Sequence, residues 1–272
     1  MLLETAAVLA ILALQGAAGA VSEAPTPLSR EAAEMYLRTS EVVRLEEYDN
    51  RGITRPRKAV LSDGAHSLNA VFKDIDVTTP KTRTADGRTV FNLKDSYKHE
   101  IAAYELDKLL EIGIVPPTVE RRIGRETGSL QFWIEGAMTE WQRKRVHQLT
   151  PPDVEAWNNQ ISTLKLFLQL IWDTDYNNIS NILVDPDWKL WKIDSSRAFI
   201  ATGKLRREAS LNRFSRRLLR ALDELDRAEL ESTLGPWLSR SQIAKLWQRQ
   251  SRIVELAEER VTEFGEAAVL YD

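Results

Sequence analysis

Apolar and polar residues alternate along the first half of the chain in a way that predicts a small antiparallel sheet. The alternation over residues 41–76 is interrupted at Asp63-Gly64, and Asp-Gly between two apolar runs is a strong hairpin signal. Two further runs, at 115–121 and 128–136, predict additional strands. The stretch 77–92 is rich in Thr, Lys and Arg, so we expect a polar loop there.

Apolar residues at helical spacing predict that most of the remaining chain is helical. Ser29 and the Thr150-Pro-Pro-Asp sequence are typical helix starts, and Gly113 is a typical helix end. The predicted helices span 29–37, 95–113, 139–147, 150–171, 211–225, 228–234, 240–247 and 253–264.

Composition narrows the class of protein. With 272 residues, of which 43% are hydrophobic, the chain is long enough for one globular unit of two lobes with a substantial core. The net charge of −3 lacks the basic excess usual in nucleic-acid-binding proteins, so we expect no nucleic-acid partner. The chain has no Cys, and its three His stand at spacings unlike those of a zinc site.

The first twenty residues are apolar and end in small residues that resemble a signal-peptide cleavage site. They carry Glu4 where a signal peptide has Lys or Arg, and they are short for a transmembrane span. Residues 22–28 contain two Pro and are typical of a linker. We therefore interpret 1–28 as a signal peptide or membrane anchor with its linker, and expect an exported or membrane-associated protein rather than a cytoplasmic one.

Side chains suited to chemistry are concentrated between residues 173 and 194. Asp173, Asp175 and three Asn fall within nine residues, and two short strands around an Asp-Pro-Asp turn then lead to Asp194. Carboxylate and amide oxygens at the base of a hairpin can hold a hard divalent cation beside phosphates. Phosphoryl-transfer enzymes of the protein-kinase type use this layout: a catalytic Asp, an Asn about five residues on, and a metal-binding Asp after a hairpin.

Two stretches, Asp175 to Asn181-Ile-Leu-Val and Ile193-Asp194-Ser-Ser-Arg-Ala-Phe, resemble the catalytic segment of atypical kinases. These are the phosphatidylinositol 3-/4-kinases, the HipA-type kinases and uncharacterised bacterial relatives, in which Asp-Arg-x-x-x-Asn precedes Ile-Asp-His or Ile-Asp-Phe. Here Tyr176 stands in place of the Arg, and Ser195-Ser196 follows the second Asp.

The spacing within this loop leaves two pairings open. Asp175 and Asn181 are six residues apart, whereas Asp173 and Asn178 have the five-residue spacing of the family. We favour Asn181 because it directly precedes the Ile-Leu-Val strand, as the metal-binding Asn of the family does.

The resemblance implies a two-lobed, protein-kinase-like α+β fold. The N-lobe, a small antiparallel sheet with one helix, would span 29–136, and the mainly helical C-lobe would span 137–272. Lys73, at the end of a Val-Phe-Lys strand, matches the Lys that binds nucleotide phosphates. Glu100 lies in the sequence Lys98 to Asp107, which is similar to the bacterial relatives, and would pair with Lys73. Without the rest of the pattern, Lys73 and Glu100 would each be interpreted as an ordinary charged residue on the surface.

The implied function is an ATP- and Mg²⁺-dependent phosphotransferase that acts on a hydroxyl of a protein, a lipid or a small molecule. Asp175, or Asp173 in its place, would orient or deprotonate the hydroxyl, and Asp194 with Asn181 or Asn178 would hold Mg²⁺. Lys73, fixed by Glu100, would neutralise phosphate charge. Backbone groups between Phe132 and Gly136, including those of Ile134 and Glu135, would bind the adenine ring.

Other interpretations stay open at this point. The Ser195-Ser196 substitution and the irregular loop are compatible with a pseudokinase or nucleotide-binding scaffold without turnover. The Asp and Asn residues could also be a turn that caps neighbouring backbone. A metal-dependent phosphoesterase is disfavoured, because no His-Asp motif supplies a second set of ligands. The Arg residues at 206, 207, 213, 216, 217 and 220 predict either an anion-binding surface or an ordinary solvated helix face.

Overall fold

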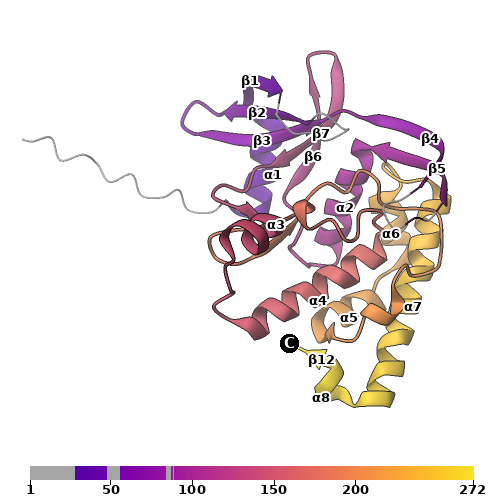
Figure 1. The fold of residues 1–272 in the computed structure, drawn as a ribbon. Helices are drawn as coiled ribbons and strands as arrows, with labels where there is room; N and C mark the ends of the chain where they lie inside the picture. Colours follow the sequence, from indigo (N-terminus) through magenta and orange to yellow (C-terminus); the bar gives the residue numbers. More distant parts are fainter. Residues whose placement is uncertain (1–27, 48–55, 84–86, 88) are drawn as a thin grey trace, which may run out of the picture.

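The computed structural model describes residues 28–47, 56–83, 87 and 89–272. A sheet lies at one end of the molecule and a group of helices at the other, with helix α2 (Tyr97–Leu109) between them (Figure 1). The predicted signal peptide or anchor and nearly all of the linker lie outside the described residues. Within the described ranges, no helix is long and apolar enough to cross a membrane.

The sheet has five antiparallel strands in the order β1-β2-β3-β7-β6. Between β2 and β3 the Asp63 carboxylate accepts hydrogen bonds from the amides of Ala65 and His66, and Gly64 has a φ of +89°, which makes the turn. The strands are β1 (Glu41–Glu47), β2 (Arg57–Ser62), β3 (Ser67–Lys73), β6 (Thr118–Ile123) and β7 (Glu126–Phe132). The prediction of a small antiparallel sheet is confirmed.

The prediction of a loop over 77–92 is wrong. This stretch belongs to an antiparallel hairpin made of β4 (Asp76–Arg83) and β5 (Thr89–Ser96), inserted between β3 and α2. The side chains of β4 are almost all exposed, so the strand shows no apolar alternation from which it could be predicted. Its stability rests on backbone pairing and on Thr residues, which favour strands.

Two helices accompany the sheet. Helix α1 (Arg30–Thr39) is capped by Ser29, as predicted, and α2 (Tyr97–Leu109) is capped by Ser96. Helix α2 buries residues all round its circumference, including His99, Glu100 and Asp107, which is typical of a helix enclosed on several sides. The Asp107 carboxylate accepts hydrogen bonds from the amides of the three residues 113–115 and thereby fixes the loop after the helix.

The second half of the chain is mainly helical. Its helices are α3 (Glu140–Gln142), the π-helical turn η1 (Arg143–His147), α4 (Val154–Leu170), η2 (Ile179–Asn181), η3 (Glu208–Ser210), α5 (Arg216–Asp223), α6 (Arg227–Leu234), α7 (Arg240–Phe264) and α8 (Glu266–Val269). The helices predicted at 240–247 and 253–264 are therefore one continuous helix, α7.

Two small sheets complete this half. Strands β8 (Met138–Thr139), β9 (Ile182–Val184) and β10 (Leu190–Lys192) form one sheet in the order β10-β9-β8, so the predicted hairpin before Asp194 is present. Strands β11 (Phe214–Ser215) and β12 (Leu270–Tyr271) form a parallel pair.

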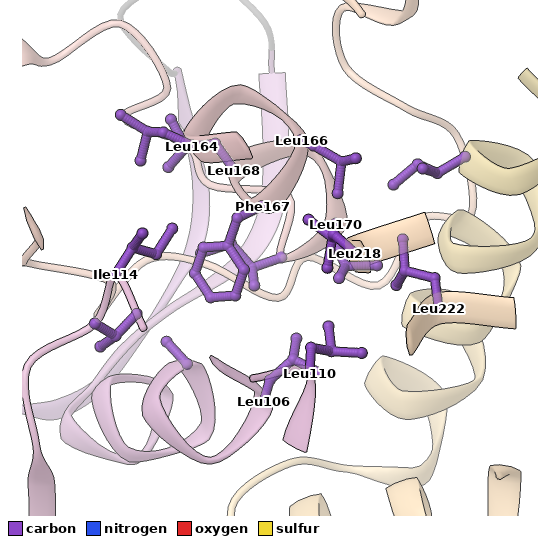
Figure 2. Close-up of a cluster of buried hydrophobic side chains, with 14 of the residues drawn as sticks. Leu106, Leu110, Ile114, Leu164, Leu166, Phe167, Leu168, Leu170, Leu218 and Leu222 are labelled. Carbon is purple, nitrogen blue, oxygen red and sulfur yellow. The ribbon is translucent and has the colours of Figure 1, made fainter. Parts of the chain in front are cut away.

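The larger of the two hydrophobic clusters formed by the described residues joins α2 to the helical half. Figure 2 shows Leu106 of α2 and Leu110, which directly follows that helix, facing Phe167 of α4, with Leu218 and Leu222 of α5 beside them. All five side chains are buried, and burying each apolar side chain contributes about 1.5–3 kcal/mol. This shared core fixes α2, and with it Glu100, relative to the loop that follows α4.

Candidate active site

The Lys73 ammonium joins three segments that are far apart in the sequence. Its Nζ donates to Oε1 of Glu100 at 2.7 Å and to Oδ1 of Asp194 at 2.8 Å. The expected pairing of Lys73 with Glu100 is therefore present, and both side chains are buried. Burial by itself lowers the pKa of Lys73, but the two carboxylates outweigh it and raise the pKa above its ordinary value, so Lys73 stays charged.

Asp194 follows β10 and has a φ of +59°, a backbone conformation that is uncommon outside glycine. The amide of Ser195 donates to Oε2 of Glu100 at 2.9 Å, and Nζ of Lys192 donates to the carbonyl oxygen of Asp194. Burial raises the pKa of Asp194, but the charge of Lys73 prevails and holds that pKa at about 2. Its Oδ2 makes no hydrogen bond to the described residues, and the side chain is 34% exposed.

Asp173 lies at the start of the loop that follows α4, and it is 1% exposed. Its Oδ1 accepts the amide hydrogen of Asp175 at 2.7 Å, and its Oδ2 lies 2.9 Å from Nζ of Lys192. Arg206 donates to the carbonyl oxygens of Asp173 and Thr174. These contacts hold the loop to its surroundings, and the Asp173 carboxylate is paired by charge with Lys192, although its Oδ2 accepts no hydrogen bond from the described residues.

The Asp175 side chain is in a different situation. It is half-buried and makes no hydrogen bond to any described residue. Burial raises its pKa above the ordinary value, the neighbouring Asp173 raises it further, and the Arg197 cation partly offsets the effect. A carboxylate with a raised pKa and no internal partner is suited to accept a proton from a bound group.

Two successive turns accommodate the six-residue spacing between Asp175 and Asn181. The amide of Asn178 donates to the carbonyl of Asp175 at 2.7 Å, and the amide of Asn181 donates to the carbonyl of Asn178 at 3.0 Å. Asn178 is exposed, and its side-chain oxygen accepts the amide hydrogen of Ser180, which is a local capping contact.

Asn181, by contrast, is buried next to the Asp194 segment. The amide of Ile193 donates to its carbonyl oxygen at 3.0 Å, and its own side-chain Nδ2 has no hydrogen-bond partner among the described residues. A buried amide group without a partner is uncommon in proteins and often marks the place of a ligand. The structure thus brings Asn181, and not Asn178, beside Asp194.

The oxygens of Asp194 and Asn181 suit a hard divalent cation such as Mg²⁺. Across the described ranges, no group of three His, Cys, Asp or Glu side chains is arranged to hold a metal ion. An ion at this place would need further ligands from phosphates and water, which is how Mg²⁺ is usually bound beside nucleotides.

The residues expected to contact adenine follow β7. Phe132 differs from the expectation, because its amide donates to the carbonyl of Pro117 at 2.8 Å and is not free for a ligand. Glu135 is exposed, and its Oε1 accepts a hydrogen bond from Asn69. Residues 135 and 136 form a turn, and the amides of Ile134 and Glu135 donate no backbone hydrogen bond to the described residues.

Several residues of this region escaped the sequence analysis. Lys192 was read as part of a strand, although its Nζ supports both Asp173 and Asp194. The Arg cluster does not form one surface, because Arg206 is buried against the loop while Arg216 pairs with Glu266. The sequence has one local sign of this role for Lys192. It ends an otherwise apolar three-residue strand, and a buried cation at such a position requires a partner.

Comparison with known proteins supports the fold. No family model and no curated protein sequence matches the chain. Its structure is similar to that of hydra Fam20, solved with a sugar, with a TM-score of 0.64, 14% identity, and coverage of 89% of this chain and 91% of that one. It is also similar to the Golgi casein kinase, with a TM-score of 0.59, 14% identity, and coverage of 89% and 79%. The protein therefore has a mixed α+β fold of the atypical-kinase type, with an antiparallel-sheet N-terminal part and a helical C-terminal part.

Proposed function

We propose that the protein is an ATP- and Mg²⁺-dependent phosphotransferase that acts on a hydroxyl acceptor. The observation that carries the proposal is the bridge of Lys73 to Glu100 and Asp194, at 2.7 and 2.8 Å. It sets a buried cation beside a carboxylate with one free oxygen, which is an arrangement that can receive a metal-bound triphosphate. The loop resemblance to phosphatidylinositol and HipA-type kinases supports the same chemistry.

Each residue has one role in this proposal. Lys73, held by Glu100, neutralises phosphate charge, and Asp194 with Asn181 holds Mg²⁺, which supplies further charge neutralisation when bound. The acceptor oxygen bonds to the terminal phosphorus as the bond to the bridging oxygen breaks, Asp175 takes the hydroxyl proton, and ADP leaves. Asp173 and Asn178 stabilise the conformation of the loop, and backbone groups of Ile134 and Glu135 hydrogen-bond to the adenine ring.

The proposal is tested with Asp194→Asn. The amide keeps one neutral oxygen but loses the charge that a divalent ion requires. We expect Mg²⁺-dependent ATP turnover to fall by about 10²–10³-fold while circular dichroism stays that of the wild type. Asp187→Asn, an exposed Asp on the turn between β9 and β10, is the control and should keep wild-type turnover. Equal activity of Asp194→Asn and wild type would refute the metal-binding role.

A nucleotide-binding scaffold without turnover is the second candidate. It is favoured by Tyr176, which takes the place of the family's Arg, hydrogen-bonds through its hydroxyl to Ser210, and lies under the Arg207 guanidinium. Under this alternative the wild-type protein binds ATP but shows no turnover with protein, lipid or small-molecule acceptors, so the two candidates separate in one assay.

The remaining expectations are part of the proposal. We take 29–136 as the N-lobe and 137–272 as the C-lobe, and expect no nucleic-acid partner. Export or membrane association rests on the composition of residues 1–28. Fractionation of cells that express the full chain tests it, and a wholly cytoplasmic protein would contradict it.

A further inference from the structure

Arg197 lies three residues after Asp194, in a turn that is fixed on several sides. The amide of Ala198 donates to the carbonyl of Ser195 at 3.0 Å, which closes the turn. The carbonyl of Ser196 accepts from the amide of Ser96 at 3.0 Å and contacts Nδ1 of His99 at 2.8 Å. The turn is thus attached to the start of α2, and the backbone of Arg197 has a defined position.

The side chain of Arg197 is also oriented. Its Nε donates to Oδ2 of Asp95 at 2.7 Å, and the side chains are 28% and 7% exposed, respectively. Asp95 comes from β5, the strand of the hairpin that the sequence did not predict. Because Asp95 holds only the Nε, both terminal nitrogens of Arg197 remain without a hydrogen-bond partner among the described residues.

Three cations interact with the carboxylates of the site, and they differ in how many of their hydrogen-bond donors are free to bind a ligand. Lys192 donates hydrogen bonds to the carbonyls of Ile193 and Asp194, and its Nζ forms an ion pair with Asp173 at 2.9 Å. Lys73 is held by Glu100 and Asp194. Arg197 interacts electrostatically with both Asp175 and Asp194, and its terminal nitrogens have no hydrogen-bond partner among the described residues.

The positions of the Asp175, Asp194 and Arg197 charges indicate the chemical group that would bind between them. The group to be transferred must lie between the base, Asp175, and the cation-binding Asp194, and it carries three non-bridging oxygens with negative charge. A guanidinium that is fixed at Nε and free at its two terminal nitrogens can bind two such oxygens at once. No cationic side chain directly follows Asp175, where the resembling kinases have Arg.

We infer that Arg197, oriented by Asp95, binds the terminal phosphate of the nucleotide. The inference rests on the proposed function. It gives Arg197 contact with the phosphate that leaves ATP, and it gives Asp95 a positioning role. ADP lacks this phosphate, so Arg197 contributes to the binding of ATP and not to that of ADP.

The test measures the affinity of the full chain for ADP and for a non-hydrolysable ATP analogue, each with Mg²⁺, by calorimetry. For Arg197→Gln we expect the analogue to bind about 10- to 100-fold more weakly, as for loss of a charged hydrogen bond, with ADP affinity changed by less than about twofold. Arg197→Lys and Asp95→Asn should lie between wild type and Arg197→Gln. Arg227→Gln, whose Nε pairs with Glu231 on the exposed face of α6, is the matched control and should bind like wild type.

Two results would overturn the inference. If the affinities for the analogue and for ADP fall together in Arg197→Gln and Arg197→Lys, Arg197 has only a structural role in the turn. If neither affinity changes, Arg197 does not face the nucleotide. A wild-type protein that binds neither nucleotide would instead refute the proposed function, and the inference with it, so the two failures are distinguishable.

Discussion

Replacing Asp173 and Asp175 by Asn, one at a time, tests the hypothesis that Asp173 stabilises the loop and that Asp175 is the catalytic base. Asp173 is 1% exposed, and its Oδ2 lies 2.9 Å from the ammonium of Lys192, which is buried as well. At this distance, and with an effective dielectric constant of about 20, two unit charges attract by ~6 kcal/mol before desolvation is subtracted. Removal of one partner of a buried pair costs about 3–5 kcal/mol of unfolding free energy.

We expect Asp173→Asn at the lower end of this range, about 3 kcal/mol. The amide oxygen can still accept the hydrogen of the Asp175 amide, and Lys192 keeps its hydrogen bonds to two carbonyls. The loss of unfolding free energy therefore comes mainly from removing the Asp173 charge next to the charge of Lys192.

Asp175→Asn should behave in the opposite way. Its pKa is raised from the ordinary 3.8 by burial and by Asp173. A carboxyl group with a raised folded-state pKa makes its full contribution to stability below its unfolded pKa, and that contribution is lost as the pH rises through the folded pKa. At pH 7 we therefore expect Asp175→Asn to be as stable as wild type or slightly more stable, with turnover reduced by about 10²–10⁴-fold.

Urea unfolding at pH 7, followed by the fluorescence of the eight Trp residues, gives the stabilities, and ATP turnover with acceptor gives the activities. A loss below about 1 kcal/mol in Asp173→Asn, or wild-type turnover in Asp175→Asn, would refute the reasoning. If the two phenotypes are exchanged, the catalytic role moves to Asp173 and the metal-binding role to Asn178.

Three further predictions concern the surroundings of the site. Glu100→Gln keeps an oxygen for the amide of Ser195 but loses the charge beside Lys73, and should cost about 2 kcal/mol in urea unfolding; unchanged stability would contradict the ion pair. Burial lowers the pKa of His99 from 6.5 to about 4, so its neutral form contributes roughly 3 kcal/mol above pH 6.5 that is lost as the pH falls towards 4. His99→Gln should flatten this part of the stability profile, and an unaltered profile would assign it to other groups. A Cβ at Gly128 would lie 2.2 Å from the carbonyl oxygen of Lys73. Gly128→Ala should therefore cost about 1–3 kcal/mol and weaken nucleotide binding, and a variant with wild-type melting temperature and binding would count against this close contact.

Much of the fold could be predicted because its signals are local. The Asp63-Gly64 turn and the helix cap at Ser29 depend on residues within a few positions, and the structure has them where expected. The hairpin β4–β5 could not be predicted, because its exposed side chains obey no burial pattern. The single helix α7 was divided in two because its apolar periodicity is weak between the two predicted segments.

By itself, the sequence determined the grouping of Asp175, Asn181 and Asp194 around a short hairpin, since that hairpin spans few residues. Tertiary structure decided which partners these groups have. Asp173 meets Lys192 across the hairpin, Glu100 meets Lys73 and the amide of Ser195, and Asp95 meets Arg197 across 102 positions of sequence. No periodicity encodes such contacts, because they arise only when the shared core of α2, α4 and α5 fixes the segments relative to one another, and burial then requires each charge to find a partner.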